Sequence, residues 1–138
     1  MKTFLKIICI TALISLTACK TITPQSVEIR TKAITYVATA SALTVHPEYK
    51  PALKIASASF LTLSVSTNID LTTIMALVQN LPFKELSTPQ ANIIVNASLI
   101  LLQDTAGQLS ITQPEQLRSF SLGAHEGIDM ALLLSGVK

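Results

Sequence analysis

Apolar residues recur along most of the chain at the three- and four-residue spacing of an amphipathic helix. In one stretch, Leu53, Ala56, Phe60 and Leu63 follow this spacing and mark a single apolar face. Combined with start and stop signals, the pattern predicts five helices, at about 24–45, 50–67, 71–81, 89–105 and 113–135. The fold class that follows is an all-α, compact helical bundle.

Capping signals precede four of the predicted helices. Thr23-Pro24 and Thr88-Pro89 each place a hydroxyl cap before a proline at the first helical position, where the missing N–H costs nothing. Asp70 is placed to cap the third helix, and Thr112 with Glu115 has the spacing of a capping box. These signals fix where the helices begin.

Two stretches, 34–43 and 93–102, are apolar or small on nearly every side. This composition predicts that the first and fourth helices are central and packed on several sides. Residues 93–102 would also suit a buried strand, but their length and the start at Pro89 favour a helix. The first helix ends at His46-Pro47 and the second opens at Lys50-Pro51, because the residue before a proline is held out of the helical region.

The two halves of the chain show a weak repeat. Thr-Pro-Gln opens an apolar helix at 23–25 and again at 88–90, and each helix leads to a turn with Pro-Glu, at 47–48 and 114–115. Duplication and chance both explain such a match. The repeat predicts two helical hairpins joined by the short helix 71–81.

The N-terminal residues have the layout of a secretory signal. Lys2 and Lys6 give a positive start, and 7–16 form an apolar stretch too short for a bilayer, which needs roughly 20 residues. Leu16, Thr17, Ala18 and Cys19 then resemble the lipobox of bacterial lipoproteins. The resemblance implies cleavage before Cys19 and attachment of a lipid to its thiol. An ordinary signal containing a cysteine, or an uncleaved anchor, is the alternative.

The resemblance divides the chain into a signal peptide at 1–18, a lipidated cysteine with a short tether at 19–23, and a helical domain at 24–138. Lys20 follows the cysteine where an Asp would retain the protein at the inner membrane, so the resemblance implies the outer membrane, facing the periplasm. Cys9 would leave with the signal, so the mature domain would have no free thiol and no disulfide.

Charge excludes one class of partner. The ten basic residues include Lys2 and Lys6, and the other eight balance eight acidic residues that all follow Cys19. No basic patch remains for nucleic acid, and no polybasic stripe for anionic lipid. The expected partners are the membrane, through the N-terminal lipid, and a protein at its surface.

The last predicted helix carries small residues every fourth position, at Ser119, Gly123, Gly127, Ala131 and Ser135. Two glycines inside a helix cost about 1 kcal/mol each relative to alanine. We therefore expect this ridge to let another helix approach closely. The alternative is that the small residues are merely tolerated.

One cluster has the look of a chemical site. His125 and Asp129 are four apart on one helix face, as two metal ligands would be, and Glu126 occupies the place of the base in a zinc protease motif. Asp129 replaces the second histidine of that motif, and His46 is the only other histidine, so a solvated polar face is favoured. We predict no catalytic residue and no cofactor.

Beyond the lipobox, residues 34–40 (ITYVATA), 46–51 (HPEYKP) and 81–86 (LPFKEL) resemble small uncharacterised helical lipoproteins of phages, prophages and their bacterial hosts. The leading hypothesis is a non-enzymatic, lipid-anchored module that binds or braces a protein partner at the cell envelope. A pilotin-like assembly factor and a phage exclusion or lysis lipoprotein are specific forms of it. The rival is a ligand or metal carrier that uses a bundle cavity or the His125 face.

Overall fold

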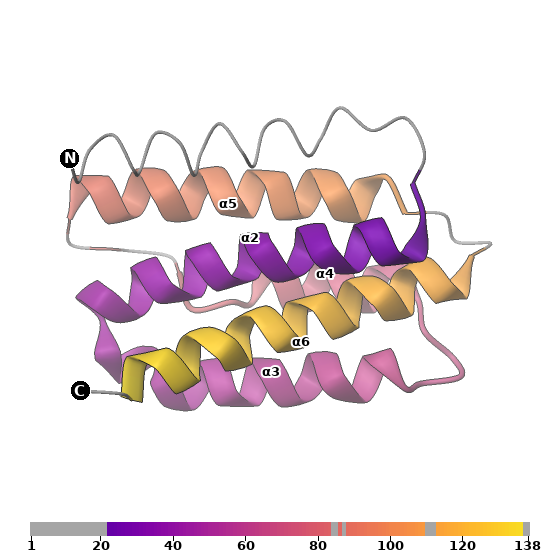
Figure 1. Ribbon diagram of the computed structural model, residues 1–138, viewed down its shortest axis with the longest axis horizontal. Coiled ribbons are helices and arrows are strands. Elements are labelled where there is room, and N and C mark those ends of the chain that lie inside the picture. The colour runs from indigo at the N-terminus through magenta and orange to yellow at the C-terminus, as the bar shows by residue number, and fades with distance from the viewer. Residues whose placement is uncertain (1–21, 84–85, 87, 110–112, 137–138) are drawn as a thin grey trace.

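The computed structural model describes residues 22–83, 86, 88–109 and 113–136 (Figure 1). In these residues the elements are α2 (Pro24–Val45), a 3-10 turn η2 (Pro47–Tyr49), α3 (Lys50–Ser64), α4 (Leu71–Gln79), α5 (Pro89–Gly107) and α6 (Pro114–Gly136). The predicted all-α class and the five helix positions are confirmed. The strand alternative for 93–102 is wrong, because these residues lie inside α5.

Two of the predicted caps are formed as expected. The Thr23 hydroxyl accepts the backbone N–H of Ser26 at 3.1 Å, and the Ser26 hydroxyl accepts the Thr23 N–H at 3.0 Å, which makes a reciprocal capping box. Asp70 accepts a backbone N–H at the start of α4 at 2.8 Å. Thr88 does occupy the cap position of α5, but its side chain makes no capping bond. The box predicted at Thr112 lies outside the described residues.

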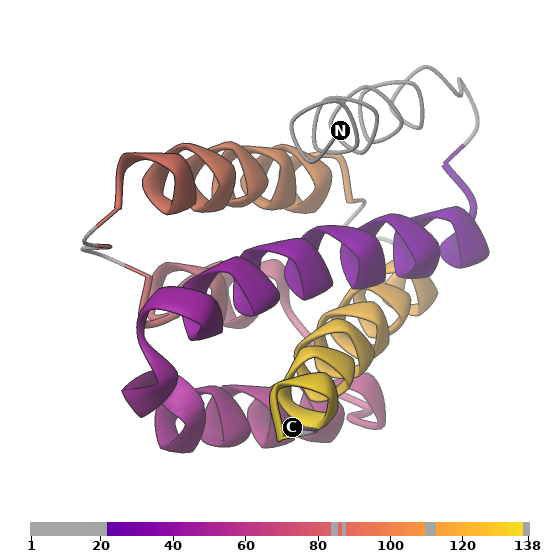
Figure 2. The same cartoon turned by 60° about the vertical axis from the view of Figure 1, so that its left-hand side comes forward.

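Helix α2 passes through the middle of the bundle, with α5 on one side and α6 on the other (Figures 1 and 2). Helix α6 lies between α2 and α3, runs in the same direction as α2, and runs antiparallel to α3 (Figure 1). The predicted pair of hairpins is therefore wrong. Helices α2 and α3 do not pack as a pair, because α6 lies between them, and α5 does not pack as a pair with α6.

The two helices expected to be central differ. Helix α2 contacts α5, α6 and η2, which confirms its central place. Helix α5 packs on α2 and α4 only by one face, where Val95 and Leu102 are buried. On its other face Ile93 and Ile100 are 67% and 66% exposed, so the prediction for this helix is wrong. An apolar composition all round does not by itself supply neighbours on every side.

The core lies where all five helices of the described residues meet. Leu53 and Phe60, from the apolar face predicted in the second helix, are fully buried there with Ile74, Phe120 and Ile128. None of the helices in the described ranges is long and apolar enough to cross a membrane.

Candidate functional site

A groove runs along the surface between α3 and α6. It has a volume of about 610 Å³, and the two helices form its walls. Its floor is mainly apolar, and charged residues stand on both walls. We call it the α3–α6 groove, and its lining residues are Lys54, Ser57, Ala58, Leu61, His125, Asp129, Leu132, Leu133 and Gly136.

His125 ties the two walls of the groove together. Its ring Nδ1 lies 2.8 Å from the Ser57 hydroxyl and 3.2 Å from the Ser57 carbonyl oxygen. A carbonyl oxygen can only accept, so the second contact assigns the ring proton to Nδ1. Ser57 is itself buried, which makes this bond a fixed link between α3 and α6.

The side chains of the predicted polar cluster, His125, Glu126 and Asp129, do not converge on one point. His125 bonds to α3, whereas Glu126 pairs with Lys32 of α2, with 2.9 Å between Oε2 and Nζ. Asp129 is exposed beside the groove. His46 lies elsewhere, at the corner between α2 and η2, where its Nδ1 is 2.6 Å from Glu48 Oε1. Within the described ranges no three His, Cys, Asp or Glu side chains lie close enough to hold a metal ion.

The glycine ridge faces α2. An added Cβ at Gly123 would lie under 3.0 Å from the backbone oxygen of Glu28, and one at Gly127 would meet the Thr35 hydroxyl and the Lys32 backbone oxygen as closely. Real Cβ atoms essentially never approach so closely. The expected close helix contact is therefore present at the two glycines. Of the other ridge positions, Ala131 is buried while Ser119 and Ser135 are half-buried.

Opposite this ridge, α2 buries a row of hydroxyls. Thr31, Thr35 and Thr39 recur every fourth residue and are at most 2% exposed. The Thr35 hydroxyl donates to the Thr31 carbonyl at 2.8 Å, within its own helix. The hydroxyls of Thr31 and Thr39 have no hydrogen-bond partner among the described residues. Small side chains on both helices thus set a short distance between their backbones. The consequence is that two buried hydroxyls are left without a hydrogen bond among the described residues.

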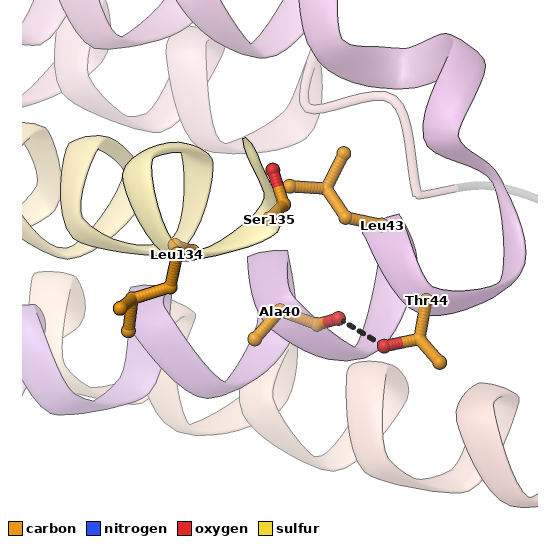
Figure 3. Close-up of a pocket in the computed structure, with 6 residues that line it drawn as sticks. Ala40, Leu43, Thr44, Leu134 and Ser135 are labelled. Atoms are coloured by element: carbon orange, nitrogen blue, oxygen red, sulfur yellow. Dashed lines mark hydrogen bonds between the residues drawn. The ribbon is translucent and has the colours of Figure 1, made fainter. Parts of the chain in front are cut away.

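Farther along α2 and α6, the same interface opens into a hollow of about 290 Å³ (Figure 3). We call it the α2–α6 hollow; Ala40, Leu43, Thr44, Ala131, Leu134 and Ser135 line it. The Thr44 hydroxyl donates a hydrogen bond to the Ala40 carbonyl at 2.8 Å (Figure 3). The hollow therefore offers a small surface of mixed polar and apolar character.

Exposed apolar side chains gather on the last turns of α6. Leu133, on the wall of the α3–α6 groove, is 67% exposed, and Leu134, beside the α2–α6 hollow, is 55% exposed. Met130 lies one turn earlier and is 39% exposed. Large apolar side chains that gather beside a groove mark an interaction surface more often than scattered ones do.

Sequence reasoning found His125 and Asp129 but missed their surroundings. Ser57 carries no distinguishing signal in a stretch rich in Ala and Ser, so its pairing with His125 was not predictable. The exposure of Leu133 was equally hidden, because the helical period does not say which neighbours are present. The lipobox, Leu16 to Cys19, lies outside the described residues.

Comparison of the chain with protein-family models, with curated proteins and with solved structures finds no match.

Proposed function

We propose that the mature chain is a non-enzymatic, lipid-anchored envelope protein that binds a partner protein through the α3–α6 groove. The lipobox at Leu16 to Cys19 supports the anchor. The groove, with exposed leucines on its edge, is the observation that carries the binding role. The division of His125, Glu126 and Asp129 among three directions speaks against the metal-carrier rival.

The shape of the groove suits a helix of the partner. The lining residues of α6 run from His125 to Gly136, which at 1.5 Å per residue gives a length of about 16 Å, or three helical turns. Aliphatic side chains at helical spacing on the partner would fill the space between Leu61 and Leu133. Lys54 on α3 and Asp129 on α6 have opposite charges, so the partner helix would carry complementary charges on its two edges.

A small-molecule carrier is the second candidate, since the volume of the groove lies within the range of about 300–1,000 Å³ typical of ligand pockets. The exposure of Leu133 favours the protein partner. Ligand pockets bury about 70–90% of their ligand, whereas here a leucine on the wall itself remains 67% exposed. A helix laid along the groove would cover that side chain.

Site-specific photocrosslinking in the native envelope tests the proposal. A photoreactive amino acid replaces Leu133 in one variant and Ile29 of α2 in a matched control, since both side chains are more than half exposed. We expect a discrete protein adduct from position 133 and none from position 29.

The crosslinking result separates the two candidates. Equal adducts at both positions, or none at position 133, would contradict the groove as the binding surface. A stoichiometric small molecule or metal found by mass spectrometry in the protein purified from its membrane would instead support the carrier.

A further inference from the structure

The outer face of α5 presents exposed aliphatic side chains to the surroundings. Ile93 and Ile100 are 67% and 66% exposed, and Ala97 between them is also exposed. Because these residues are three to four positions apart, they form one stripe along the helix. The opposite face of α5, with Val95 and Leu102, is buried against α2 and α4. The stripe is thus apolar surface that the bundle itself does not cover.

This stripe lies on a helix that has almost no charge. Residues 89–103 contain no ionisable side chain, and Asp104 in the last two turns is the first. The three other long helices of the described part each carry charges that are not buried, among them Arg30 on α2, Lys54 on α3 and Asp129 on α6. A charge brought toward hydrocarbon loses its hydration, which is costly. Among these four helices, α5 carries the fewest charges. Asp104, one turn beyond Ile100, is exposed on the same face and would have to stay in the headgroup layer if this face approached lipid.

The proposed lipid anchor lies at the right end of the molecule for such an approach. The N-terminal end of α2 and the C-terminal end of α5 lie at the same end of the bundle in both views (Figures 1 and 2). From Cys19 to the cap residue Thr23 there are four residue steps, which reach about 14 Å when fully extended. The acyl chains on Cys19 would thus hold a bilayer close to this end of α5.

We propose that the outer face of α5 lies on the bilayer that holds the acyl chains of Cys19, with Ile93 and Ile100 at the boundary between headgroups and acyl chains. This inference rests on the proposed lipidation. Helix α3 lies on the side of the molecule opposite α5, with α2 between them (Figures 1 and 2). With α5 on the bilayer, α3 therefore faces away from the membrane and the α3–α6 groove stays accessible to a partner. The exposed isoleucines of α5 would leave water at this boundary, which favours the contact.

Fluorescence quenching by brominated lipid tests the seating. The mature chain has Cys19 as its one cysteine, so a second cysteine becomes a unique free thiol in the lipidated protein. Ile100→Cys is labelled with an environment-sensitive fluorophore, and Ile55→Cys on α3 is the control, because Ile55 is 70% exposed. Both proteins are reconstituted into phosphatidylcholine vesicles with brominated acyl chains. We expect quenching at least about twofold stronger at position 100, since an interfacial helix face lies about 5–10 Å deep.

A second labelled variant, Ile93→Cys, repeats the test about two helical turns away and should give the same result. Equal quenching at positions 55 and 100, in protein that is acylated and floats with the vesicles, would overturn the proposed contact of α5 with the bilayer. The proposed lipid anchor would still stand. An unacylated Cys19, seen by mass spectrometry, would overturn both proposals. Protection of position 100 from a water-soluble maleimide in native envelopes, with no quenching in vesicles, would show that a protein covers α5 and would overturn the lipid contact.

Discussion

Gly127 of α6 lies where a single methyl group would meet both the Thr35 side chain and the Lys32 backbone. The backbone oxygen of Lys32 cannot rotate away, so relief requires the two helices to separate. Separation would loosen Ile128 and Ala131, which are buried on the same helix. At this position the absence of a side chain is what sets the distance between α2 and α6.

We expect Gly127→Ala to lower the free energy of unfolding by about 1–3 kcal/mol, the usual cost of overpacking, even though alanine is the better helix former. Gly107→Ala is the matched control, because nothing lies within 4 Å of a Cβ added there. The control should be neutral or stabilising by up to about 1 kcal/mol. Chemical denaturation of the unlipidated domain from Lys20 onward measures both. Equal effects of the two substitutions would contradict the close contact.

Cys19 is the residue on which the proposed lipid attachment depends. Cys19→Ser should give a precursor that is neither cleaved nor lipidated, because serine lacks the thiol that accepts the diacylglyceryl group. Metabolic labelling with palmitate and the apparent mass of the protein measure the result, with Cys9→Ser as the control that should label normally. Palmitate incorporation into the Cys19→Ser protein would show that the lipobox interpretation is wrong.

At the scale of elements, Ser57 and His125 link α3 to α6, while the hydroxyl of Ser59 on the same helix donates to the Ile55 carbonyl one turn away. Ser57→Ala should destabilise the domain by about 1 kcal/mol, since it removes a partly buried hydrogen bond between two helices and leaves the His125 ring without its hydroxyl partner. Ser59→Ala should be neutral or slightly stabilising because alanine favours the helix. Thermal melts of the two variants compare them directly, and a larger loss in Ser59→Ala would exclude the interhelical role of Ser57.

The start of α4 depends on the charge of Asp70. The Thr73 backbone N–H, and after it the Thr73 hydroxyl, donate to this carboxylate at 2.8 Å and hold the pKa of Asp70 below its ordinary value. The capping contribution is therefore complete above the unfolded pKa and is lost as the pH falls through the lower, folded pKa. Thr73→Val removes the hydroxyl donor and should raise the pKa of Asp70 toward its ordinary value. An NMR titration of the carboxyl group measures it, and an unchanged pKa would mean that the hydroxyl contributes nothing.

At the scale of the whole molecule, the short tether between Cys19 and α2 would hold the bundle near the headgroups. Helix α2 begins at Pro24, and the capping box at Thr23 fixes that start. Chain that is already helical cannot extend to lengthen the tether. If the partner is embedded in or lies against the membrane, function would require this close position.

A flexible insertion of about twenty residues after Lys20 should therefore impair function, because such a linker lets the domain move tens of ångströms from the surface. The protein should remain folded and lipidated. The same insertion after Lys138 is the control and should leave function intact. The measurement is whatever phenotype deletion of the protein produces, and full activity of the first variant would show that closeness to the membrane is incidental.

The sequence by itself determined the helices, because their signals are local. The hydroxyl of Thr23, the carboxylate of Asp70 and the prolines at Pro24, Pro47 and Pro89 act within one turn, and the helices begin and break where these residues predict. The close contact at Gly127 was also readable, since a glycine inside a long helix is costly unless a neighbour requires it. Thr88 occupies the predicted cap position of α5, but its side chain makes no capping bond.

Only the tertiary structure decided which helices are neighbours. Pairing depends on how all the helices fill the core together, and a period of 3.6 residues reports an apolar face without naming what covers it. Helix α6 therefore separates α2 from α3, although the repeat in the sequence favoured hairpins. For the same reason the helix that contains Ile100 was expected to be packed on several sides, yet Ile100 lies exposed. His125 bonds to Ser57, sixty-eight residues away in the chain. Local chemistry fixes each element, whereas the sharing of buried surface among elements is a property of the folded chain as a whole.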